Sequence, residues 1–162
     1  EDRQGEGVVQ MMSIQSNMTL SDFSLQGFRR AWKWLNPQKE IACVKEMIRE
    51  LAIKVSDPDL PVTSLSGGNQ QKVVLGKALM TKPEVVFLDE PTRGIDVGAH
   101  AEIIRLIETL CADGLALLVI SSELEELVGY ADRVIIMRDR RQVAEIPLDK
   151  LSVPAIMNAI AA

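Results

Sequence analysis

The chain has 162 residues, 47% of them apolar and 25% charged, and its 23 acidic and 18 basic residues give a net charge of −5. This apolar content is enough for the core of one ordinary domain. No stretch approaches the ~20 apolar residues that a membrane span needs, and we expect neither a secretory leader nor, at this acidic balance, a nucleic-acid partner.

The amino-terminal third is expected to hold two helices. Residues 1–35 are irregular and rich in Met, Ser and Gln, with Val8-Val9 as a candidate short strand and Ser13 as the candidate cap of a short helix. Asn36 followed by a proline predicts the start of a longer helix, because proline suits the first helical position. Apolar residues then recur at helical spacing, and two prolines are expected to end the helix: Ile41, Val44, Ile48 and Leu51, then Pro58 and Pro61.

The middle of the chain is predicted to form a long helix, followed by a strand, a second helix and a second strand. This long helix is expected from about Gly68 to Met80, with Lys82-Pro83 as its stop. The apolar run 85–88 follows as a buried strand. A helix over residues 99–111 then leads into the apolar run 115–120, predicted as a second buried strand. This strand-helix-strand order is typical of a parallel sheet.

The carboxy-terminal part is expected to form a short helix, a hairpin and a docking helix. Ser122, with Glu125 three residues on, has the spacing of a capping box. Residues 134–137 and 143–146 predict a hairpin with a loose turn at 139–141, and residues 152–162 predict the docking helix. The two cysteines, Cys43 and Cys111, lack metal-ligand spacing and are expected to be buried reduced thiols.

Two motifs carry chemistry. Ser66-Gly67-Gly68 opens a helix, where free backbone N–H groups at the positive end of the helix dipole can hold a phosphate. Asp89-Glu90 ends a predicted strand with two carboxylates, one suited to Mg²⁺ through water and one to orienting an attacking water. Alone, the first is usually a cap and turn and the second a strand exit. In this order, and followed by Gly94-Ile95-Asp96, they predict nucleotide hydrolysis.

These motifs resemble those of the ATP-binding cassette family, as the signature, Walker B and D-loop respectively. Asn69, the segment 93–96 and Ser121-Ser122-Glu123 are similar to the second cassette of double-cassette monosaccharide importer ATPases. The resemblance implies an α/β fold, a partial P-loop NTPase with a helical subdomain and the carboxy-terminal half of a RecA-like parallel-sheet core. Residues 1–162 would be a fragment of one nucleotide-binding domain, with a helical and signature region at about 8–82, half of the core at about 83–146 and a final helix at about 147–162.

A P-loop, Gly-x-x-x-x-Gly-Lys-Ser/Thr, is expected upstream of the signature in this family. The glycines before Gly67 are Gly5, Gly7 and Gly27, and no Lys-Ser/Thr follows them. We therefore expect the chain to start inside the domain and, alone, not to hydrolyse ATP. We also expect it to self-associate in isolation, because a Walker B strand without its neighbour leaves apolar faces and an unpaired edge.

The resemblance implies a role for each site residue. ATP would lie between two cassettes, with Ser66, Gly67 and Gly68 on its γ-phosphate and with Asn69 and Gln70 at the edge of the site. Asp89 would hold Mg²⁺ through water, Glu90 would orient or deprotonate the attacking water, and Asp96 would communicate across the dimer. Glu1 stands at the Q-loop position. Ser122 stands where the family has its switch histidine, so this cassette's own Walker site is expected to be impaired, and His100 is expected to have a surface or capping role.

The implied partners are a second cassette, the membrane permease and, indirectly, a periplasmic sugar-binding protein, at the cytoplasmic face of the inner membrane. Glu1, Asp2 and four aromatic residues, Phe23, Phe28, Trp32 and Trp34, would lie near the groove for the permease, although aromatics in such a stretch also commonly pack under their own loop. ATP and Mg²⁺ are the implied cofactors. Two alternatives stay open, an ATP-binding cassette protein of DNA repair or translation, and a non-enzymatic remnant or regulatory module.

Overall fold

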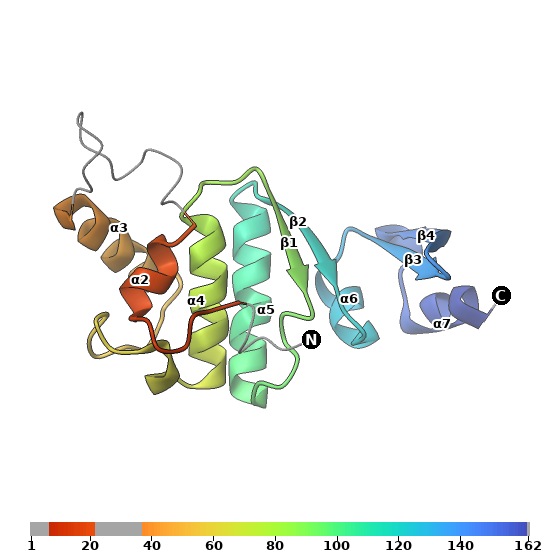
Figure 1. Ribbon diagram of the computed structural model, residues 1–162. Coiled ribbons are helices and arrows are strands. Elements are labelled where there is room, and N and C mark those ends of the chain that lie inside the picture. Colours follow the sequence, from red (N-terminus) through yellow and green to blue (C-terminus); the bar gives the residue numbers. More distant parts are fainter. Residues whose placement is uncertain (1–6, 22–36, 162) are drawn as a thin grey trace. The chain divides into compact units, whose positions relative to one another are not determined.

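The computed structural model describes residues 7–21 and 37–161, which form two compact units (Figure 1). Of the described residues, the first unit comprises 7–21, 37–86 and 92–118, and the second comprises 87–91 and 119–161. Both units contain helices and strands, and the two alternate from residue 67 to residue 138, which confirms the α/β expectation. Among the described helices, none combines the length and the apolar character needed to cross a membrane.

The first described helix, α2 (Ile14–Thr19), is capped as predicted by Ser13, whose Oγ accepts a hydrogen bond from Ser16 N at 3.1 Å. The expected strand at Val8-Val9 is wrong. Val9 instead pairs with the side chain of the fully buried Asn17, donating to Oδ1 at 2.7 Å and accepting from Nδ2 at 3.0 Å. The same Nδ2 also lies 3.2 Å from Met12 O. A buried amide thus takes the place of a partner strand.

Helix α3 (Pro37–Glu50) has the predicted range, and its expected cap, Asn36, lies outside the described residues. Pro58 and Pro61 do not end it. Ala52 adopts a positive φ of 47°, Ala52 N donates to Arg49 O, and Ile53 N donates to Ile48 O at 2.9 Å. These bonds form a Schellman motif, which satisfies the last carbonyl groups of the helix well before either proline.

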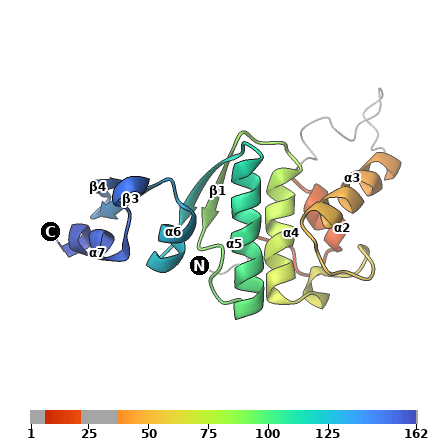
Figure 2. The ribbon, with the colours of Figure 1, turned by 180° about the vertical axis from the view of Figure 1, so that it is seen from behind.

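Helices α4 (Gly67–Leu79) and α5 (Val97–Ala112) lie side by side in both views (Figures 1 and 2). A short 3-10 turn, η2 (Val62–Ser64), precedes α4. Cys111 at the end of α5 is exposed and Cys43 on α3 is only partly buried, so the expected buried thiols are wrong. The main apolar core of this unit consists of residues from several described segments before β1: Val8, Ile14, Met18, Val44, Leu51, Ile53, Val62 and Val73.

Strands β1 (Val85–Asp89) and β2 (Ala116–Ile120) pair with each other on either side of α5 in the sequence. Ala116 N donates to Glu84 O, and Glu90 N donates to Ile120 O, so both strands run in the same direction, as predicted. The prediction that both strands are buried is wrong for one face of the pair. Phe87 is 70% and Ile120 55% exposed, because successive side chains of a strand point to opposite faces.

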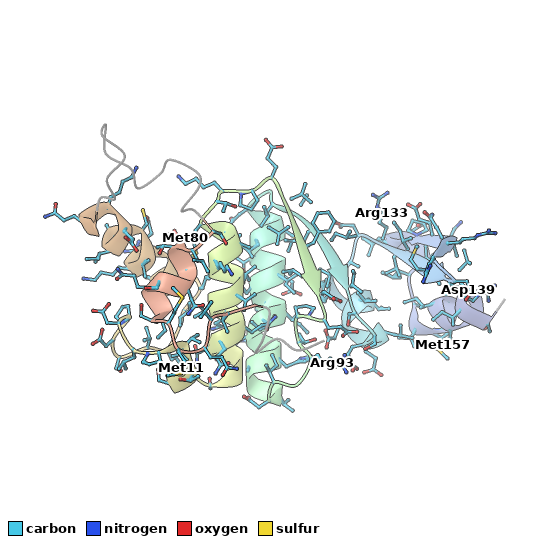
Figure 3. All side chains as sticks on the ribbon, in the orientation of Figure 1. Met11, Met80, Arg93, Arg133, Asp139 and Met157 are labelled. Carbon is cyan, nitrogen blue, oxygen red and sulfur yellow. The ribbon has the colours of Figure 1, made fainter. Side chains whose placement is uncertain are left out.

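In the second unit, β3 (Arg133–Arg138) and β4 (Arg141–Pro147) form the predicted antiparallel hairpin. The turn is tight rather than loose, since Arg138 pairs with Arg141 and only Asp139 and Arg140 connect them (Figure 3). Their φ values of 51° and 64° match a type I′ turn, which fits the twist of a hairpin but usually contains glycine. Two non-glycine residues here accept the left-handed conformation.

Two helices pack with this hairpin, α6 (Leu124–Tyr130) and α7 (Val153–Ala161), the second after the 3-10 turn η3 (Leu148–Lys150). Ser152 caps α7 as predicted, accepting from Ala155 N. The predicted cap of α6 is wrong, because Glu123 and not Ser122 occupies the N-cap position. The buried core of this unit is small: Leu127, Val134, Ile136, Ile146 and Ile156.

Candidate functional site

The amino end of α4 has open backbone donors. Gln70 N donates to Ser66 O at 2.9 Å, which is the first bond of the helix, so the N–H groups of Gly67, Gly68 and Asn69 have no partner within it. Ser66 is the N-cap residue, yet its side chain makes no capping bond. At other helix starts, Ser13 and Asp96 do cap with their side chains. The donors and the positive end of the α4 dipole therefore stay open to an anion.

The two signature glycines have different surroundings. Gly67 is exposed, and a Cβ built on it would lie 3.7 Å from Ile95 Cγ2, which is an ordinary contact. Gly68 is buried, and its Cβ would clash with the Cβ of Ala99 on α5. Gly67 therefore leaves room beside the open donors, whereas Gly68 allows α4 and α5 to approach each other closely.

The next two residues direct their amides toward their own chain. Asn69 Nδ2 donates to Ser66 Oγ at 2.9 Å, and Lys54 N donates to Asn69 Oδ1 at 2.8 Å. Gln70 Nε2 donates to Leu65 O at 2.9 Å. A shallow pocket lies beside these residues, and its lining includes both signature and D-loop positions: Val8, Gly67, Gln70, Gln71, Val74, Gly94 and Ile95.

Asp96 is the N-cap of α5, and its Oδ1 accepts from Ala99 N at 3.0 Å. The structure thus places the predicted D-loop residue in the same unit as the signature, at the start of the helix that packs against α4. His100 follows in the first turn of α5 and is half-buried. Its backbone N–H donates to Asp96 O.

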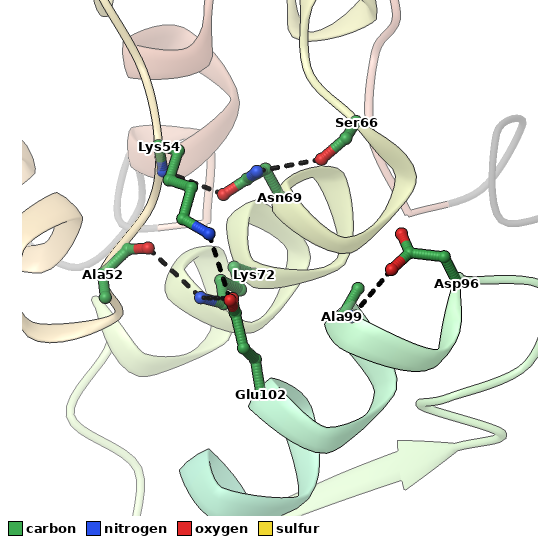
Figure 4. A network of polar contacts seen from close by, with 8 residues as sticks. All are labelled: Ala52, Lys54, Ser66, Asn69, Lys72, Asp96, Ala99 and Glu102. Atoms are coloured by element: carbon green, nitrogen blue, oxygen red, sulfur yellow. Dashed lines mark hydrogen bonds and ion pairs between the residues drawn. The ribbon is translucent and has the colours of Figure 1, made fainter.

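An ion-pair network that the sequence did not predict links α4 and α5 near the signature (Figure 4). The side chain of Lys72 is only 5% exposed, and its Nζ lies 2.8 Å from Glu102 Oε2 and 3.1 Å from Ala52 O. Lys54 Nζ lies 3.1 Å from Glu102 Oε1. Hydrogen bonds from Lys72 and then Lys54 lower the pKa of Glu102 to about 2. The apolar residues that follow Lys72 were the available signal that its helix is buried there, but nothing in the sequence indicated its partner.

The predicted carboxylates lie in the second unit. Asp89, the last residue of β1, is exposed. Glu90 follows with a positive φ of 48°, an unusual conformation of the kind found at functional sites. Its Oε1 accepts from Ser122 N at 3.1 Å. The structure therefore brings Glu90 and Ser122 together, while Glu1 lies outside the described residues.

Tyr130 is a further polar group of this unit that no sequence motif indicated. Its buried hydroxyl has no hydrogen-bond partner in the described part of the chain. Burial, followed by the negative charges of Glu126 and Glu90, raises the pKa of Tyr130 to about 12. The phenol is therefore neutral at physiological pH and lies within the electrostatic influence of Glu90.

The parallel strand pair that ends in adjacent carboxylates and the helix whose first donors are open both belong to an α/β fold. Solved structures share this fold. The dimeric ATP-binding cassette MJ0796 with ADP and Pi is 21% identical and has a TM-score of 0.71, covering 87% of this chain and 59% of its own. An inward-facing putative metal-chelate type ABC transporter is 16% identical with a TM-score of 0.75, covering 93% and 59%.

The sequence profile described as ABC transporter matches residues 3–93, more than half of the chain. The chain belongs to the ABC transporter family. It is similar to the galactofuranose transporter ATP-binding protein YtfR of Escherichia coli K12, with 63% identity over all of this chain and 32% of that protein. The ribose import ATP-binding protein RbsA 2 of Rhizobium etli is 45% identical over 97% of this chain and 30% of its own length. The xylose import ATP-binding protein XylG of E. coli K12 is 42% identical over 98% and 31%. The chain thus spans about a third of the length of these relatives.

Proposed function

We propose that this chain is part of the ATP-binding subunit of an ABC importer for a monosaccharide, and that it acts within a longer protein carrying further cassette sequence. The uncapped amino end of α4 carries the proposal, because Ser66 and Gly67 are exposed there beside open backbone donors. The similarity to galactofuranose, ribose and xylose transport proteins over nearly the whole chain favours a sugar as the cargo.

The signature residues would contact the γ-phosphate of an ATP that another cassette holds. The hydroxyl of Ser66 and the N–H groups of Gly67 and Gly68 are the donors. Donors that are already in place stabilise charge on the transferred phosphoryl group without reorganising during the reaction. Asn69 and Gln70 would border this site, and Asp96 would connect it with the partner cassette.

The second unit would serve another nucleotide. Asp89 is exposed and Glu90 has one oxygen not engaged by Ser122 N, so both can face Mg²⁺ and water. In the described residues, no group of three or more His, Cys, Asp or Glu side chains forms a metal cage. Mg²⁺ commonly takes most of its ligands from phosphate and water, so one or two carboxylates would be enough to hold it here. Mg²⁺ would neutralise phosphate charge, while Glu90 orients water.

Ser122 distinguishes the nucleotide site that Glu90 serves from the site that the signature residues complete. Its backbone N–H holds Glu90, but its side chain offers no imidazole at the position of the family's switch histidine. We infer that the nucleotide site served by Glu90 is impaired and that Ser66 to Gly68 complete the competent site. The complete protein would bind the permease at the cytoplasmic face of the inner membrane and receive sugar through a periplasmic binding protein.

The test is sugar uptake driven by ATP in proteoliposomes that contain the complete subunit and its permease. Ser66→Ala should lower uptake and ATP hydrolysis at least about tenfold, whereas Glu90→Gln should change them by less than about twofold. Ser64→Ala is the matched control, because it also removes an exposed serine hydroxyl just before α4. A Ser66→Ala protein as active as the Ser64→Ala protein would refute the proposal.

A further inference from the structure

The orientation of the Asn69 side chain follows from its neighbours (Figure 4). The atom of Asn69 that lies 2.8 Å from Lys54 N must be the oxygen, because a backbone N–H group can only donate. The atom 2.9 Å from Ser66 Oγ is therefore the amide nitrogen, which can only donate. The amide flip that usually leaves asparagine ambiguous is excluded here by chemistry.

This orientation determines what the Ser66 hydroxyl can do. Since Asn69 Nδ2 donates to Ser66 Oγ, the serine oxygen is an acceptor in this contact and keeps its own proton for another partner. From these contacts we infer that Asn69 is a positioning residue, which holds Ser66 Oγ with its proton available to a phosphate oxygen. The inference rests on the proposed function of Ser66 as a phosphate ligand.

The contact also explains why Ser66 does not cap its helix. An N-cap serine normally turns its oxygen to a backbone N–H of the first turn, as Ser13 does with Ser16 N at 3.1 Å. The Ser66 side chain makes no such bond. The Asn69 amide thus holds the serine oxygen in place of the backbone N–H of the first turn, which stays open for the anion.

The amide is itself held in place. Its acceptor contact is to the backbone of Lys54, which follows directly on the Schellman motif at the end of α3. The side chain of Lys54 is fixed to Glu102 of α5 at 3.1 Å, and Glu102 is fixed to the buried Lys72 of α4 at 2.8 Å. The amide orientation is therefore set by Lys54 N, and the ion pairs of Glu102 link the segment of Lys54 to α4 and α5.

A double-mutant cycle in the complete subunit with its permease tests the inference. The variants are Ser66→Ala, Asn69→Ala and both together, and the readouts are kcat and KM for ATP hydrolysis. Asn69→Ala should lower kcat/KM about tenfold when Ser66 is present, which corresponds to one hydrogen bond, and less than about twofold in the Ser66→Ala background. Asn158→Ala, which removes an exposed amide from α7, is the matched control and should change neither background.

A second variant covers the case in which Asn69→Ala loses its fold. Asn69→Asp keeps the acceptor for Lys54 N, but its other oxygen would accept the proton of Ser66 and turn it away from the ligand. Its loss of kcat/KM should be at least about tenfold larger with Ser66 than in the Ser66→Ala background. Equal losses in both backgrounds would overturn the inference while leaving the proposed function intact. A Ser66→Ala protein of normal activity would overturn both.

Discussion

Lys72 Nζ lies 2.8 Å from Glu102 Oε2, so an almost fully buried ammonium group joins the helix that begins after Ser66 to the helix that begins after Asp96. The pair is asymmetric. The side chain of Lys72 is 5% exposed and that of Glu102 is 39% exposed. Glu102 also has a second cation, Lys54, whereas the other contact of Lys72 is the carbonyl group of Ala52.

Removing either partner should therefore have unequal effects on stability. Glu102→Ala leaves a buried ammonium group without its counter-ion and should lower the free energy of unfolding by about 3–5 kcal/mol. Lys72→Met leaves a carboxylate that still has Lys54 and water, and should cost about 1–3 kcal/mol. Urea denaturation at pH 7 measures both values. Lys54→Met, at an exposed pair, should cost under about 1 kcal/mol, and equal costs for the Glu102 and Lys72 variants would contradict this asymmetry.

Acid should weaken the same network in a defined range. The pKa of Glu102 falls from an ordinary 4.5 to about 2 on folding, so this carboxylate stabilises the native state above pH 4.5. Its contribution is lost as the pH falls from about 4.5 toward 2, because the unfolded chain then binds the proton more readily. The free energy of unfolding of the parent should thus fall more steeply over this range than that of Glu102→Gln. Parallel curves would show that Glu102 does not contribute.

The two signature glycines should separate stability from function. Gly68→Ala places a Cβ against that of Ala99 and should destabilise the fold by about 1–3 kcal/mol through overpacking. Adding Ala99→Gly should restore much of this loss. Gly67→Ala meets only an ordinary contact and should leave the unfolding midpoint nearly unchanged while it impairs ATP hydrolysis. Thermal unfolding and ATPase assays on the four forms of the complete subunit with its permease, parent included, check the division. A stable Gly68→Ala protein would refute the packing role.

The turn between β3 and β4 should gain stability from glycine. Arg140 adopts a φ of 64°, which a residue with a Cβ reaches only at a cost. Arg140→Gly should therefore raise the free energy of unfolding by about 0.5–1 kcal/mol, as glycine suits this position of a type I′ turn. Arg141→Gly, one residue later within β4, is the control and should lower stability.

The positive φ of Glu90 should be detectable as local strain. Both Glu90→Gly and Glu90→Ala remove the carboxylate and its bond from Ser122 N, but only glycine accepts a φ of 48° without cost. The glycine variant should be more stable than the alanine variant by about 1 kcal/mol in urea denaturation. The reverse order would mean that the backbone is relaxed at this position.

Elements with strong local signals were predictable from the sequence. The long apolar periods gave α3, α4 and α5, and short apolar runs gave β1, β2 and the hairpin, because periodicity records which face is covered. The missed features depend on contacts between distant residues. Asn17 binds Val9, Lys72 binds Glu102, and Ser122 holds Glu90 through its backbone instead of capping α6. Neither the type of these residues nor their sequence neighbours indicates which distant residue each one will contact.

For the candidate site, too, the motifs were predictable from the sequence and the contacts of their residues were not. The signature, the carboxylates and the D-loop were recognisable as motifs, whereas the different surroundings of Gly67 and Gly68 depend on Ala99, which lies on the neighbouring helix. The orientation of the Asn69 amide, with Oδ1 toward Lys54 N and Nδ2 toward Ser66 Oγ, likewise depends on Lys54, which precedes it by 15 residues. A motif identifies the residues that meet a ligand, but the neighbouring segments determine which atoms are available to it.

The buried amide of Asn17 has a mechanical consequence. It binds Val9 by two hydrogen bonds and Met12 by a third, so these bonds hold the segment before α2 to this helix. Helix α2 packs in turn on α4, the helix that begins beside Ser66. A pull applied to the chain at Val9 would therefore pass through the Asn17 amide to α2, and from α2 to the helix against which it packs, α4.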